Sequence, residues 1–365
     1  MVQGSLYYPI FINIVMLVSL VKSFQLFSYR REKLLRGQNN FLIPLLGAIL
    51  LILVMGLRPI TFAFGDTVNY AASYHALRNG VATYDSDAGE AIFNGLMAIC
   101  AEAMDVAYFF LIVEIGYIGF IFWACKRLTK NHIFIAFLFC IGAFSFFTYG
   151  TNGIRNGLAT SLVILAISYC NGTKKELIFA GICAFIAFGI HKSIMLPIIA
   201  AVVAIQYPNT KFYIYFWLGS IIISLVAGGW VENIFFGLGF DDRMDNYLTN
   251  DEYNDQFSSI GFRFDFLLYS MMPIVLGYYL VIKRKIYNST YLLLLNSYIL
   301  SNAFWVMVIR ASFSNRFAYL SWFLYPLVLA YPLLKLPIWK DQGKKTGLIL
   351  FGHTFFSYIM WLIKG

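Results

Sequence analysis

The chain has 365 residues, of which 60% are hydrophobic and only 12% carry charge. A soluble protein has about 25% charged residues, and a globule of this length has too little interior to bury so much apolar surface. Together with a mean hydropathy of +0.72, these values exclude a soluble protein and predict an all-α, polytopic integral membrane protein. The net charge of +9 lies mainly in loops between apolar segments, so it indicates membrane topology and not nucleic-acid binding.

About twelve apolar segments approach the length of roughly 20 residues that a bilayer-spanning helix needs. The N-terminus turns apolar without a basic region or a cleavage site, so the first segment is expected to be a span and not a cleaved signal. The apolar segment 91–104 is short, and we expect it to form a helix in the membrane interface, with an extra span as the alternative. No soluble domain is evident, so residues 1–365 are expected to form a single transmembrane domain. The expected spans are 5–21, 41–57, 106–125, 132–149, 154–170, 177–190, 193–206, 212–229, 264–282, 290–309, 317–334 and 347–363.

The basic residues alternate between the two sides of these spans. Eighteen of the 27 Lys and Arg residues fall in one set of loops, which the positive-inside rule places in the cytoplasm. Both termini and two long loops, 58–105 and 230–263, are then extracytoplasmic. Loops of this length without structure of their own are commonly functional or disordered.

Nucleotide-dependent and redox chemistry find no support in the sequence. The expected cytoplasmic loops are short and no GxxxxGK[ST] motif occurs, so chemistry driven by ATP or a nucleotide sugar is not expected. The five cysteines lie in or beside apolar segments without CxxC spacing. We therefore expect neither a disulfide framework nor a zinc site.

The expected outer face has few basic residues, but seven of its nine are arginine. A guanidinium presents a planar, permanently charged fork that suits phosphate oxygens, so an anionic ligand is indicated there. Alternatively, these arginines anchor helices or pair with outer carboxylates. Four short polar motifs contribute to this face: GLR followed by GDTVNY over 56–70, GTNGIRNG over 150–157, His191-Lys192-Ser193, and Arg310 followed by SNRFAY over 314–319.

In their order along the chain, these motifs resemble the EpsG family of exopolysaccharide-synthesis proteins, which are Wzy-like O-antigen and exopolysaccharide polymerases. The resemblance rests on GLR, GD-x-x-NY, Glu90 before an apolar aromatic segment, RNGLA, HKS and NRFAY, over about residues 40–335. Lys192-Ser193 departs from the small residues expected there. The resemblance implies a GT-C-like fold in the bacterial cytoplasmic membrane that acts on lipid-linked sugars on the exterior or periplasmic side.

A Wzy-like polymerase transfers a growing glycan from an undecaprenyl diphosphate carrier to a lipid-linked repeat unit. The expected partners are this lipid-linked oligosaccharide and membrane lipids, with a chain-length regulator as a further candidate and no nucleic acid. Asp66 is the first candidate for the base that activates the acceptor hydroxyl, followed by Glu90 and His191. The residues expected to hold the diphosphate are Arg58, Arg155, Arg316 and Arg310, and those expected to contact sugar are Tyr70, Asn69 and Tyr319.

We expect this glycosyltransferase to need no cofactor and no metal. The arginines can neutralise the diphosphate, and the acidic cluster Asp241/Asp242/Asp245 has no neighbouring histidine. Glu114 lies well inside an expected span, where it is either functional or an interfacial group.

Three other functions stay open. A polyprenyl-linked glycan ligase or a single-sugar GT-C transferase would use the same arginines. A lipid-linked saccharide transporter would need a path of charged groups across the membrane, which only Glu114 offers. A structural or assembly protein would leave the arginine bias unexplained.

Overall fold

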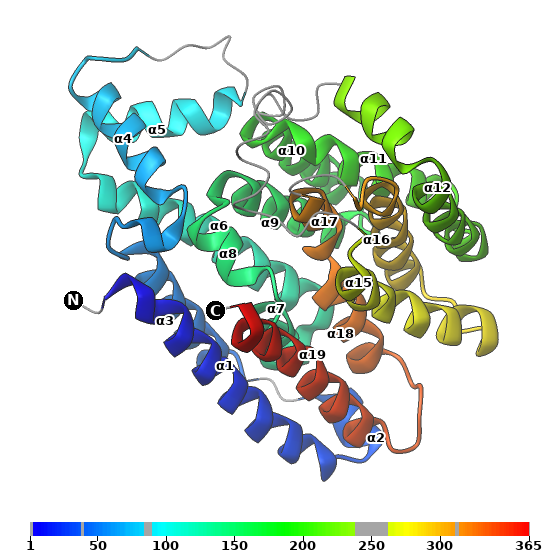
Figure 1. Ribbon diagram of the computed structural model, residues 1–365. Coiled ribbons are helices and arrows are strands. Elements are labelled where there is room, and N and C mark those ends of the chain that lie inside the picture. Colours follow the sequence, from blue (N-terminus) through cyan, green and yellow to red (C-terminus); the bar gives the residue numbers. More distant parts are fainter. Residues whose placement is uncertain (1–2, 38–39, 84–89, 238–261, 311–313, 365) are drawn as a thin grey trace. The chain divides into compact units, whose positions relative to one another are not determined.

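The computed structural model describes residues 3–37, 40–83, 90–237, 262–310 and 314–364, and every regular element in these ranges is a helix (Figure 1). Six of the helices are long and apolar enough to cross a membrane, and further apolar helices are shorter. The protein is thus all-α, and its several candidate spans indicate a multi-pass membrane protein. The helices divide into two compact units.

The first unit comprises residues 1–191 and 329–365. In it α6 packs against α3 and α9, α9 packs against α10, and α1 lies along α19 (Figure 1). Its elements are α1 (Gly4–Phe27), α2 (Arg31–Arg36), α3 (Leu42–Gly56), η1 (Phe62–Phe64), α4 (Thr67–Arg78), α5 (Ala91–Ala103), α6 (Val106–Thr129), η2 (Lys130–His132), α7 (Ile133–Ile141), α8 (Phe146–Thr151), α9 (Ile154–Tyr169), α10 (Lys174–Ile190), the end of α18 (Tyr325–Lys335) and α19 (Gln342–Lys364).

The second unit comprises residues 192–328. Its central helix is α16, which packs against α11, α12 and α17. Its elements are η3 (Lys192–Ile194), α11 (Met195–Gln206), α12 (Thr210–Gly237), α15 (Phe264–Gly277), the π-helical η5 (Tyr278–Lys283), α16 (Ser289–Met307), α17 (Ser314–Trp322) and the start of α18.

Each expected span coincides with helix, but two of them are broken. The segment 132–149 is α7 and α8, separated at Gly142, where a Cβ atom would lie 2.7 Å from Oγ1 of Thr354 on α19. Ser357 of the same helix donates a 2.8 Å hydrogen bond to the carbonyl of Gly142, so this carbonyl at the break has a partner. The segment 317–334 is α17 and α18, because Pro326 cannot donate to the carbonyl of Trp322.

The loop expected over 58–105 contains η1 and α4, which were not predicted, and also α5. The helix expected over 91–104 is confirmed as α5, Ala91–Ala103; its place in the membrane interface stays a prediction. The expected second loop also begins too early, since α12 continues to Gly237 past a kink at Ala227. Most of that second loop lies outside the described residues.

Candidate functional site

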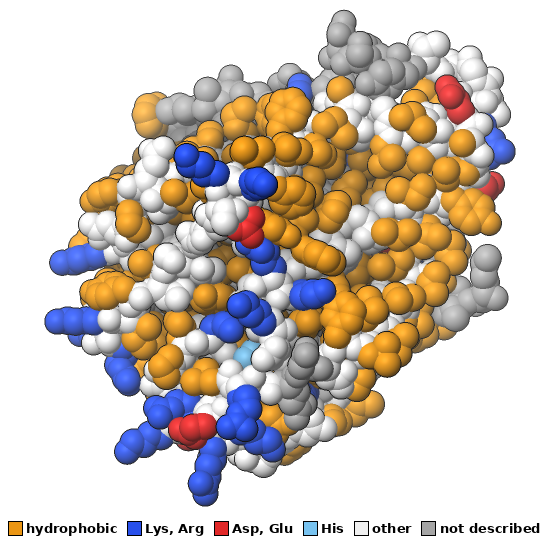
Figure 2. All heavy atoms as spheres, turned by 180° about the vertical axis from the view of Figure 1, so that it is seen from behind, with side chains coloured by type: hydrophobic (Ala, Val, Ile, Leu, Met, Phe, Trp, Pro, Cys, Tyr) orange, Lys and Arg blue, Asp and Glu red, His pale blue; other side chains and the backbone are white. Residues whose placement is uncertain are grey.

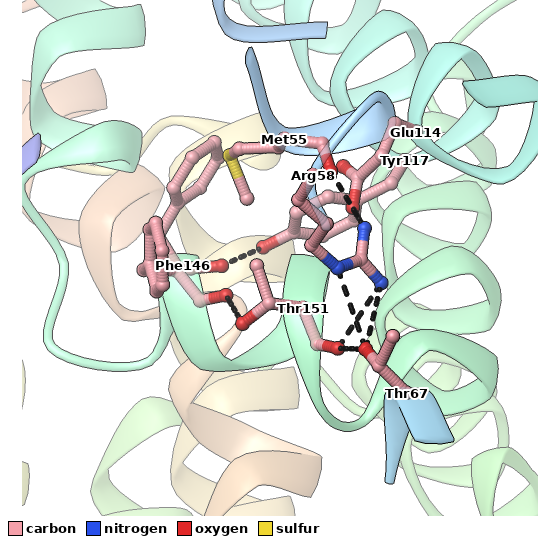
Figure 3. Close-up of polar contacts among 8 residues, drawn as sticks. Met55, Arg58, Thr67, Glu114, Tyr117, Phe146 and Thr151 are labelled. Carbon is pink, nitrogen blue, oxygen red and sulfur yellow. Dashed lines mark hydrogen bonds and ion pairs between the residues drawn. The ribbon is translucent and has the colours of Figure 1, made fainter. Parts of the chain in front are cut away.

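Arg58 follows the last turn of α3, and its guanidinium turns into the first unit rather than outward (Figure 3). Its side chain has no exposed surface, nor has that of Glu114 on α6. Nη1 donates to the carbonyl of Met55 at 2.7 Å and to Oε1 of Glu114 at 3.3 Å. Removal from water lowers the pKa of Arg58, while the Glu114 carboxylate opposes that shift. The expectation that Arg58 presents its donors to a diphosphate is therefore not met, because an internal carboxylate and carbonyls already occupy them.

The other donors of Arg58 join two distant motifs (Figure 3). Nη2 donates to Oγ1 of Thr67 at 3.2 Å and to the carbonyl of Thr151 at 3.1 Å, and Thr67 Oγ1 donates to the same carbonyl at 2.7 Å. The backbone N–H of Asp66 donates to Oδ1 of Asn152 at 2.8 Å. The start of α4 is thus locked to the segment before α9.

Glycine is required where these segments meet. Gly65 has a φ of +56°, and a Cβ atom there would lie 2.4 Å from Oδ1 of Asn152. A Cβ atom on Gly150 would lie 3.2 Å from Oε1 of Glu114 and 2.3 Å from the methyl carbon of Met55. The glycines of the GDTVNY and GTNGIRNG motifs therefore permit the close approach.

Both alternatives for Glu114 stay predictions, and its side chain is completely buried beside Arg58. Its Oε1 accepts from Arg58, and its Oε2 has no hydrogen-bond partner among the described residues. The charge of Glu114 compensates that of Arg58.

A second ionic group lies on the same unit and keeps partial contact with solvent. The carboxylate of Glu90 binds two groups at once, because Oε2 accepts from Nη1 of Arg155 and Oε1 contacts Nδ1 of His191. The exposed fractions of the three side chains are 13%, 21% and 25%, respectively. Glu90 has a φ of +67° at the start of α5, a conformation that costs of order 1–3 kcal/mol in a residue with a side chain and clusters at functional sites.

Arg155 connects this group to α4. Its Nε donates to Oη of Tyr70 at 3.0 Å, and its guanidinium carbon lies 5.5 Å from the Tyr70 ring centroid and 5.9 Å from that of Phe93. Gly157, two residues after Arg155, allows α9 to approach α8, since a Cβ atom there would lie 2.4 Å from the carbonyl oxygen of Tyr149. Arg155, Glu90, His191 and Tyr70 therefore form one contiguous cluster, which we call the Glu90 cluster.

Asp66 is the N-cap residue of α4, and Asn69 lies in its first turn, directly before Tyr70. Nδ2 of Asn69 donates to Oδ1 of Asp66 at 3.3 Å. Asp66 is half-buried and Asn69 is exposed. Both belong to the start of the helix that carries Tyr70 of the Glu90 cluster.

The remaining predicted residues belong to the second unit. Arg310 is exposed and lies 5.9 Å from the ring centroid of Phe262. Arg316 is half-buried on α17, and the ring of Tyr319 lies 5.6 Å from that of Trp322. Their diphosphate and sugar contacts stay predictions.

No group of three or more His, Cys, Asp or Glu side chains suited to a metal ion occurs in the part of the chain that the structure describes. The cluster Asp241/Asp242/Asp245 lies outside it. Thr67, Thr151 and Asn152 were not singled out from the sequence, although each lies within or beside a motif that was.

Comparison with known families gives one match. The model described as "EpsG family" matches residues 40–365. No curated protein matches the chain, and no solved structure does.

Proposed function

Since the chain belongs to the EpsG family, which indicates a role in exopolysaccharide biosynthesis, we propose that it is a polysaccharide polymerase. It transfers a growing glycan from a polyprenyl diphosphate carrier to a lipid-linked repeat unit outside the cytoplasm, in a GT-C-like architecture. The observation that carries the proposal is the Glu90 carboxylate held between Arg155 and His191. That arrangement supplies a base and an anion-binding group side by side.

In the proposed step, the acceptor hydroxyl oxygen attacks the anomeric carbon of the donor sugar. The bond between that carbon and the diphosphate oxygen breaks, and its electron pair leaves on the diphosphate. The hydroxyl proton passes to a base. The diphosphate ester is itself the activated bond, so the step needs no further energy source.

His191 is the base in this proposal. An ionised carboxylate only accepts hydrogen bonds, so the contact between Glu90 Oε1 and His191 Nδ1 selects the tautomer protonated on Nδ1. Nε2 then carries a lone pair, and no partner for it is found among the described residues. A carboxylate that orients a histidine base in this way is a recurring arrangement. Glu90 has both oxygens engaged, so it is a positioning residue.

Arg155 is the proposed diphosphate ligand of the first unit. Its Nε and Nη1 are bound by Tyr70 and Glu90, which fix the guanidinium plane. The other terminal nitrogen, Nη2, belongs to a partly exposed side chain and can donate to a diphosphate oxygen. Negative charge develops on the diphosphate as the bond breaks. Asp66, the first candidate from the sequence, and Asn69 are proposed to contact the acceptor sugar beside this group.

The experiment is the lipid-linked glycan profile of a deletion strain complemented with variants. We expect the deletion and His191→Gln to accumulate single lipid-linked repeat units and to lack long polymer. His75→Gln is the matched control, because His75 is exposed on α4 away from the Glu90 cluster. Polymer of normal length without attachment to its final acceptor would instead indicate a ligase and overturn the proposal.

A further inference from the structure

A cavity of about 290 Å³ lies at the end of α3 opposite to Arg58. Its walls come from the last turns of α1, the segments that flank α2, the first turn of α3 and the η2–α7 junction. The 15-residue α3 spans roughly 22 Å at 1.5 Å per residue, so the cavity is separate from the Glu90 cluster. Part of its wall comes from residues 22–37, which precede the family match over residues 40–365.

Hydrogen bonds hold the inner wall of the cavity in place. Nε2 of the buried His132 contacts the carbonyl of Leu34 at 2.6 Å, and its Nδ1 contacts the carbonyl of Thr129 at 3.1 Å. Nδ2 of Asn131 donates to the carbonyl of Arg36 at 3.2 Å. These bonds hold the chain after α2 against η2 and keep the cavity open between them.

Lys22 is the charged residue of this wall, and it is half-buried near the end of a candidate span. Its Nζ lies 3.4 Å from Oε1 of Gln25 and 5.4 Å from the ring centroid of Phe134. Among the described residues no carboxylate lies within 4.0 Å of it, and the neighbouring Glu32 pairs with Arg31. A partly desolvated ammonium without a counter-charge favours an anionic ligand.

The surface around the cavity is also positively charged. Lysine and arginine side chains gather on the surface around the end of α1 and around α2 (Figure 2, lower left). Lys33 lies over the ring of Tyr29 at 4.1 Å, and Arg30 and Arg36 are exposed. Such a group raises the local concentration of anions.

Apolar side chains adjoin the cavity on the lipid-facing side. Phe27 of α1 and Phe41, Leu42 and Ile43 at the start of α3 are exposed, and Ile43 also lines the cavity. A volume of about 290 Å³ is at the lower limit for small-molecule pockets, so it suits a headgroup and not a whole lipid. We infer that this cavity binds the headgroup phosphate of an anionic phospholipid, with Lys22 as its counter-charge and the acyl chains along α1 and α3.

The test uses the full-length protein in detergent, titrated with phosphatidylglycerol and followed by native mass spectrometry. Lys22→Gln should weaken the binding of one lipid molecule about tenfold, the effect of losing one charged hydrogen bond. Lys344→Gln is the matched control, because Lys344 is exposed at the start of α19 and does not line the cavity. Equal lipid binding by both variants and the wild type would overturn the assignment.

A second measurement needs no variant. Phosphatidylglycerol should slow the modification of Lys22 by an amine-reactive reagent at least threefold while leaving Lys344 unchanged, and zwitterionic phosphatidylcholine should not. Equal rates at Lys22 with and without the anionic lipid would contradict the inference. Protection by soluble glycerol phosphate at the same concentration would assign the cavity to a soluble phosphate ligand and overturn the lipid assignment.

Discussion

The carboxylate of Glu90 is bound to the guanidinium of Arg155, 65 positions further along the chain. The pair brings the start of α5 to the start of α9, and the second carboxylate oxygen reaches His191, 101 positions from Glu90. Three motifs that are separate in the sequence thus share one carboxylate. On the proposed function, this shared carboxylate sets both the tautomer of the base and the plane of the diphosphate ligand.

Replacing Arg155 with lysine should reduce polymer formation about tenfold to a hundredfold. Lysine keeps the charge but cannot contact Tyr70, Glu90 and a phosphate oxygen from one rigid plane. A charged hydrogen bond is worth about 1.5–3 kcal/mol, which corresponds to that range of rate. The measurement is polymer yield at matched membrane expression.

Arg78→Lys is the control for that variant, because Arg78 is exposed, donates to the carbonyl of Met104 at 3.1 Å and lies 3.7 Å from Oδ2 of Asp105. Its polymer yield should equal that of the wild type. Equal yields from Arg155→Lys and Arg78→Lys would mean that Arg155 only anchors α9.

Removing one member of the buried Arg58–Glu114 pair should destabilise the fold. Arg58→Met leaves the Glu114 carboxylate buried without a counter-charge, a change that costs about 3–5 kcal/mol. We expect a large fall in the thermal unfolding midpoint in detergent. The double variant Arg58→Met/Glu114→Met should recover part of it, and a double variant no more stable than Arg58→Met would argue against charge compensation.

Gly65→Ala should impair the protein more than Gly80→Ala. Both glycines have positive φ, +56° and +68°, so both substitutions carry a backbone cost, and at Gly65 the ψ of −119° lies outside the left-handed helical region that other residues can adopt. Only at Gly65 would the new Cβ atom also meet Asn152, at 2.4 Å, whereas nothing lies within 4 Å at Gly80. We expect lower thermal stability and less polymer from the first variant. Equal behaviour of the two would show that contact with Asn152 is unimportant.

The helices could be predicted from the sequence because long apolar runs in a lipid environment have few alternatives to helix. The breaks within these helices were harder to predict from the sequence. Pro326 carries a recognisable signal for the end of α17, but the break at Gly142 depends on the approach of Thr354 and Ser357 from α19. The helix α4 was missed because the polar composition of that part of 58–105 resembles that of a loop, whereas the apolar segment 91–104 did predict the helix α5.

For the site, too, the sequence indicates which residues take part but not which of them pair. The types and the motifs indicated Glu90, Arg155 and His191 as candidates, but nothing local predicts that one carboxylate serves both partners. The direction of the Arg58 side chain could not be predicted from the sequence either. It depends on which face of α6 carries Glu114 toward α3. The sequence brings Asp66 close to Arg58 along the chain, whereas hydrogen bonds of the Arg58 guanidinium go to Thr67, the next residue.

Transfer should not require a divalent cation, because the proposed chemistry uses arginine to stabilise the leaving diphosphate. Purified protein with a lipid-linked repeat unit should keep its rate of polymerisation in EDTA. Loss of activity in EDTA that magnesium or manganese restores would contradict this expectation.

The most direct test of the account is the rate of polymerisation by purified His191→Gln, with Glu90→Gln and the exposed-site control Glu102→Gln assayed beside it. A general base contributes about 10²- to 10⁴-fold to the rate, so we predict that His191→Gln loses at least a hundredfold in kcat while still binding the lipid-linked donor. Glu90→Gln should lose less, because an amide still orients the ring, and Glu102→Gln should match the wild type. Full activity of His191→Gln would contradict the assignment of the Glu90 cluster as the site of transfer.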